Sequence, residues 1–75
     1  MSKVKRRPGA TVRMASEVGP GDWIKVGPEW YQIIMNESFG KELPRDGNWA
    51  IRSKGGTFSG WDIDAYAKDG DMMEA

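Results

Sequence analysis

Six side chains in this sequence combine aromatic rings with cationic and amide groups: Trp23, Lys25, Trp30, Gln32, Arg52 and Trp61. Aromatic rings beside such groups offer stacking area, cation–π contacts and hydrogen bonds, and they lose little conformational entropy on binding. This chemistry suits non-covalent recognition of a protein or of a single-stranded nucleic acid. A core position for Trp23 or Trp30 is the structural alternative, and the sequence leaves it open.

The composition argues against most catalytic and metal-binding chemistry. The 75-residue chain contains neither cysteine nor histidine, which removes disulfides, thiol nucleophiles, Cys/His zinc sites and histidine acid–base catalysis. Its serines therefore lack the base that a Ser-His site needs. Asp69-Gly-Asp71 is similar to a fragment of a calcium loop, but the terminal bidentate glutamate is missing. We expect no enzymatic activity, no metal and no cofactor.

No run of about 18 apolar residues is present, so we expect no membrane-spanning segment. The basic N-terminus is not followed by an apolar stretch, which argues against a secretory signal. We therefore expect a cytoplasmic location. The oligomeric state stays open.

The formal net charge is zero, but the charges are segregated along the chain. Residues 1–13 carry five basic side chains and no acidic one, whereas residues 62–75 carry five acidic side chains and one lysine. A basic arm attracts phosphate backbones and an acidic tail repels them, so nucleic acid remains open as a partner. We interpret residues 1–10 as a flexible basic arm, 11–67 as a single β domain and 68–75 as a flexible acidic tail.

Two expected strands, residues 22–26 and 29–35, position the first four of the six side chains. Gly27-Pro28 between them predicts a two-residue turn, which would place Val26 opposite Glu29 and Trp23 opposite Gln32. One face of the hairpin then carries the expected core residues, Ile24, Val26, Tyr31, Ile33 and Met35. The other face carries Trp23, Lys25, Trp30 and Gln32. A one-residue change of register would exchange the faces.

A second hairpin is expected from residues 48–53 and 57–61 around Gly55-Gly56. This turn would pair Ser53 with Phe58 and place Trp49, Ile51 and Phe58 on a core face. Gly60 could form a bulge that turns Trp61 inward. Residues 11–15 alternate as a short strand does, and residues 61–67 fit either a last strand or a short helical turn.

The polar segment between the hairpins, residues 36–47, is long for a small domain. Phe39 and Leu43 are its large apolar residues and could hold it against the domain. Its length marks it as a candidate functional loop.

The pattern Val18-Gly-Pro-Gly-Asp22-x-Ile24-x-Val26-Gly27-x-x-Trp30-Tyr31-x-Ile33 resembles small SH3-like β-barrel proteins of actinobacteria and their phages. The resemblance covers about residues 12–35 and transfers no functional residues. Five short expected strands at close spacing predict an all-β fold, a small SH3-like five-stranded barrel or a curled antiparallel sheet with flexible termini. The resemblance implies the same kind of fold and a viral origin.

We therefore expect a small non-enzymatic protein-binding module that acts on a host or virion protein. The alternative is a single-stranded nucleic-acid-binding small barrel that uses exposed tryptophans and the basic arm. A third interpretation is a subunit that assembles by pairing of edge strands.

Overall fold

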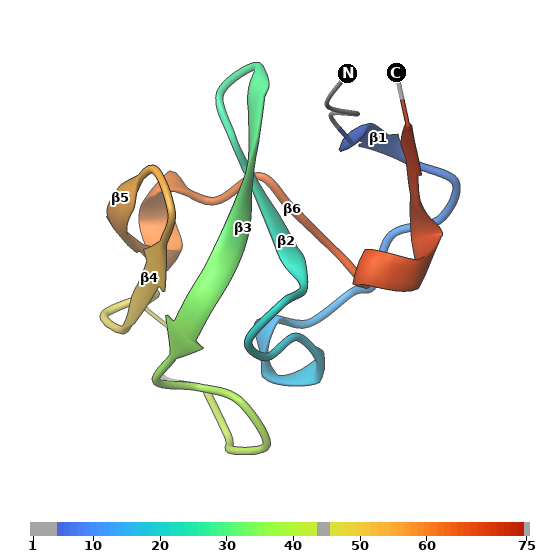
Figure 1. The fold of residues 1–75 in the computed structure, drawn as a ribbon. Helices are drawn as coiled ribbons and strands as arrows, with labels where there is room; N and C mark the ends of the chain where they lie inside the picture. The colour runs from blue at the N-terminus through green and yellow to red at the C-terminus, as the bar shows by residue number, and fades with distance from the viewer. Residues whose placement is uncertain (1–4, 44–45, 75) are drawn as a thin grey trace.

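The computed structural model describes residues 5–43 and 46–74. Its main element is a five-stranded antiparallel sheet in the order β5-β4-β3-β2-β6 (Figure 1). The strands are β2 (Trp23–Val26), β3 (Glu29–Asn36), β4 (Ala50–Ser53), β5 (Gly56–Ser59) and β6 (Ala65–Ala67). The prediction of an all-β fold is confirmed, and over the described residues the sheet curls without closing into a barrel.

The central hairpin has the predicted register. Trp23 pairs with Gln32, Lys25 with Trp30 and Val26 with Glu29. Gly27 takes a φ of 61° in the connecting turn, a left-handed conformation that glycine adopts without steric cost. The local turn chemistry was therefore sufficient to set the pairing of these two strands.

β3 departs from its expected alternation near its end. Ile33 pairs with Ser53 but Met35 pairs with Arg52, so Ile34 is an extra residue, as in a β-bulge. Met35 is consequently 53% exposed, and Asn36 is buried opposite Ile51. The prediction that Met35 belongs to the core is wrong, because the bulge reverses the facing of the residues that follow it.

The second hairpin turns at Lys54-Gly55, one residue earlier than expected. Ser53 pairs with Gly56 and Ile51 with Phe58, so the predicted Ser53–Phe58 pairing is wrong. The turn moves by one residue, so the partner of each β4 residue moves by two, from Phe58 to Gly56 in the case of Ser53. A change of two residues in the pairing leaves every side chain on the face that was expected. The Ser53 hydroxyl accepts a hydrogen bond from the Gly55 N–H at 3.1 Å and donates one to the Gly56 carbonyl at 2.7 Å, which holds this turn.

Short 3-10 helices replace two expected features. Gly60–Asp62 (η2) follows β5, and its cap joins the Ser59 and Asp62 side chains. Trp61 is therefore 71% exposed, not turned inward by a bulge. Ala15–Glu17 (η1) occupies the end of the strand expected at residues 11–15, of which only Val12 forms a bridge, to Tyr66.

The two ends of the described chain meet. β1 (Lys5–Pro8) pairs antiparallel with β7 (Met72–Glu74), after a third 3-10 helix, Asp69–Asp71 (η3). Figure 1 shows this two-stranded unit beside the main sheet. Parts of both segments that we expected to be flexible thus have strand structure.

The hydrophobic core lies on one face of the curled sheet. Four aliphatic side chains are almost fully buried, and they are Val18, Ile24, Ile33 and Ile51. Burial of each such side chain contributes about 1.5–3 kcal/mol. Half-buried aromatic rings surround them, including Tyr31 and Phe58, whose ring centroids are 4.9 Å apart.

Candidate functional site

Four of the six predicted site residues share the outward face of the central hairpin. Trp23, Lys25, Trp30 and Gln32 are each half-buried. The Trp23 indole N–H donates to Asp69 Oδ1 at 2.8 Å, and Gln32 Nε2 donates to the Gly21 carbonyl at 2.9 Å. Part of this face is therefore occupied by contacts within the chain itself.

Arg52 and Trp61 are exposed but lie elsewhere. Arg52 is opposite Met35 in the β3–β4 pair. Trp61 follows the edge strand β5, which β4 and β3 separate from β2. Trp61 is therefore not next to the four residues of the central hairpin, whereas Arg52 lies on the strand beside β3.

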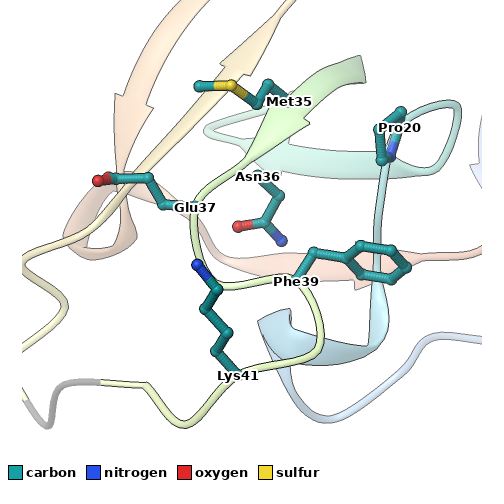
Figure 2. A pocket seen from close by; sticks show the side chains of 6 residues that line it. All are labelled: Pro20, Met35, Asn36, Glu37, Phe39 and Lys41. Carbon is teal, nitrogen blue, oxygen red and sulfur yellow. The ribbon is translucent and has the colours of Figure 1, made fainter.

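A different part of the surface contains an open hollow. Three exposed apolar side chains, Pro20, Met35 and Phe39, border a surface hollow of about 430 Å³ (Figure 2). They come from three segments: the turn before β2, the end of β3 and the loop after β3. We call this hollow the Met35–Phe39 groove; its other lining residues are Asn36, Glu37 and Lys41.

Asn36 forms the base of the groove (Figure 2) and is 7% exposed. Its Nδ2 donates to the carbonyls of Ala15 at 2.9 Å and Val18 at 2.8 Å, and its Oδ1 accepts from the Ser38 N–H at 2.9 Å. Both amide hydrogens are thus engaged. Asn36 ties the end of β3 to η1 and gives the groove a fixed base.

Phe39 forms one wall by packing on Gly19. A Cβ atom at Gly19 would lie 2.8 Å from the Phe39 ring, so only glycine allows this approach without a shift. The Phe39 N–H donates to the Asn36 carbonyl at 3.2 Å, and the Gly40 N–H donates to the Ser16 carbonyl at 2.9 Å. Phe39 was predicted to hold the loop to the domain, and these contacts confirm that prediction.

Asp22 holds the turn that carries Pro20. Its carboxylate accepts from the N–H groups of Gly19 at 2.9 Å and Asp69 at 3.0 Å, and from Lys68 Nζ at 3.1 Å. Burial raises the pKa of Asp22, but these hydrogen bonds and the Lys68 charge outweigh burial, so the pKa lies below its ordinary value. Asp22 is therefore ionised at neutral pH.

The sequence analysis did not select Pro20, Met35, Glu37 or Lys41 as binding residues. The one signal that pointed to this region was the length of the loop at residues 36–47. The groove offers apolar contact with charged groups at its border. Among the described residues, no group of three or more acidic side chains is placed to hold a metal ion.

Comparison with family models, curated proteins and solved structures found no match to this chain. The resemblance to SH3-like barrels therefore stays a prediction. Over the described ranges, we find no helix with the length and apolar character needed to cross a membrane.

Proposed function

We propose that this chain is a small non-enzymatic protein-binding module and that the Met35–Phe39 groove is its binding site. The observation that supports this most directly is the gathering of three exposed apolar side chains around one hollow. A small domain loses stability by leaving such groups in water, and exposed apolar patches often mark interaction sites. The resemblance to phage proteins adds the proposal that the partner is a host or virion protein in the host cytoplasm.

The border of the groove supports a protein partner. Glu37 and Lys41 are charged residues among those that line the hollow (Figure 2), and exposed Arg52 pairs with Met35 on the neighbouring strand. An apolar centre with a charged rim is the usual anatomy of protein interfaces. The volume, about 430 Å³, suits one or two apolar side chains of a partner.

Single-stranded nucleic acid is supported less well. A base-stacking platform needs exposed rings beside basic groups. Trp23 and Trp30 are half-buried, and exposed Trp61 is followed by Asp62. No observation in the described part of the chain favours this alternative over protein binding.

The test is a pull-down from the natural host, followed by quantitative binding with the purified partner. Met35→Glu should weaken binding at least tenfold, because it places a charge on the apolar wall. Met14→Glu is the matched control: Met14 is similarly exposed, at 52% against 53% for Met35, but does not line the groove. Equal binding by both variants would refute the groove as the site.

A further inference from the structure

The segment at residues 68–74 contacts the start of β2 in the manner of a bound peptide. After β6 ends at Ala67, Lys68 Nζ contacts Asp22 Oδ2 at 3.1 Å and the Glu17 carbonyl at 3.0 Å. The Asp69 N–H donates to Asp22 Oδ1 at 3.0 Å, and Asp69 Oδ1 accepts from the Trp23 indole at 2.8 Å. Asp22 and Trp23 thus form hydrogen bonds with backbone and side-chain groups of two successive residues, Lys68 and Asp69.

The rest of this segment is attached differently. β7 pairs with β1 and has no ladder to the five-stranded sheet over the described residues. Figure 1 shows β1 and β7 together at the two chain ends, beside the main sheet, and β1 comes close to β3. Met72 is 7% exposed and pairs with Pro8, and the Gly9 N–H donates to the Asp71 carbonyl at 2.7 Å, so the later residues of the segment are held by the N-terminal strand. The polar contacts to the main sheet are therefore concentrated at Asp22 and Trp23.

We propose that residues 68–74 are a detachable internal ligand of a surface formed by Asp22 and Trp23. When they leave, this surface binds an extended segment of a partner protein with a lysine followed by a carboxylate. The present occupant defines this chemistry: its lysine and backbone N–H satisfy the Asp22 carboxylate, and its carboxylate satisfies the Trp23 N–H.

Tethering explains why such a surface would be masked in the free protein. A segment joined to its site by a short connection acts at an effective concentration on the order of millimolar. A partner segment must therefore bind the Asp22 and Trp23 surface more tightly than residues 68–74 do. Otherwise it binds only a chain in which the contacts of residues 68–74 have been weakened. This surface is separate from the Met35–Phe39 groove, although Asp22 also holds the turn that carries Pro20.

The first test weakens the occupant and leaves the surface intact. In the full chain, Lys68→Ala/Asp69→Ala removes side-chain contacts of the segment only. The probe is a fluorescently labelled peptide with the sequence of residues 68–74, followed by anisotropy. It should bind the double variant at least tenfold more tightly than the unaltered protein, and adding Asp22→Ala should abolish the gain. Equal binding to both proteins, or to neither, would overturn the proposal.

The second test needs no variant. Amide hydrogen exchange of the unaltered protein should show that residues 69–74 open locally, with faster exchange than the paired amides of β2 and β3. Exchange of all these amides at one common, slow rate would show that the segment leaves only on global unfolding, and the proposal would fail. Met35→Glu should leave peptide binding unchanged, which separates this proposal from the groove.

Discussion

Asp22 and Lys68 are 46 residues apart in the sequence, yet their carboxylate and ammonium groups lie 3.1 Å apart. Asp22 is 14% exposed at its side chain and Lys68 is 47% exposed. The pair joins the turn before β2 to the segment after β6. Because the Gly19 N–H shares the same carboxylate, one ionised group stabilises two elements that contribute to the surfaces described above.

Acid should weaken the fold through Asp22. Its pKa in the folded chain lies below its ordinary value of 3.8, so its stabilising contribution is complete above that value and is lost as the pH falls through the folded pKa. The groups that face it are Lys68 and the N–H groups of Gly19 and Asp69. Urea unfolding from pH 7 to pH 2 should show this loss, and Asp22→Asn should reduce it. A control, Glu42→Gln at an exposed position, should keep the original pH profile.

Gly19→Ala should destabilise the protein through the Phe39 ring. The new methyl group would lie 2.8 Å from ring carbons, and overpacking of this kind costs about 1–3 kcal/mol. Phe39→Ala removes the ring, so Gly19→Ala should lower the free energy of unfolding clearly less in the Phe39→Ala background. A double-mutant cycle measured by urea unfolding gives the coupling. Additive effects would mean that the ring and Gly19 do not constrain each other.

Asn36→Ala should lower the free energy of unfolding, because the Asn36 side chain is buried and hydrogen-bonded. The substitution leaves the Val18 carbonyl and the Ser38 N–H without their partner, while the Ala15 carbonyl keeps the bond from the Val18 N–H, and each unsatisfied buried group costs about 1–3 kcal/mol. We expect a loss of about 3 kcal/mol in the free energy of unfolding. Asn48→Ala, at an exposed position, should change stability by about 0.5 kcal/mol or less. Similar losses for both variants would contradict the role of Asn36.

Binding of single-stranded oligonucleotides should be absent even at low salt. The exposed tryptophan, Trp61, is 71% exposed and has Asp62 beside it, and an acidic neighbour disfavours phosphate. A mobility-shift assay at about 20 mM salt gives the most sensitive check, because phosphate contacts strengthen as salt is removed. Retardation that disappears as salt rises would support the nucleic-acid alternative.

The predicted site and the Met35–Phe39 groove lie at different places because a bulge changes the facing of residues at the end of β3. The alternation of residues 29–35 assigned Met35 to the core, and the extra residue Ile34 places it outside. Local sequence carries no mark of this bulge. It depends on the pairing of β3 with β4 and on the burial of Asn36 against carbonyls of η1, which are 18 and 21 residues away.

The sequence by itself determined the all-β class, the Gly27-Pro28 turn, and the division of residues 23–33 into two faces. These features follow from interactions between near neighbours: a turn that glycine permits and a side-chain period of two. Tertiary structure decided the exposure of Met35, the pairing of the chain ends and the assembly of the Met35–Phe39 groove. Each of these depends on contacts between segments far apart in the chain, where packing overrides local preference.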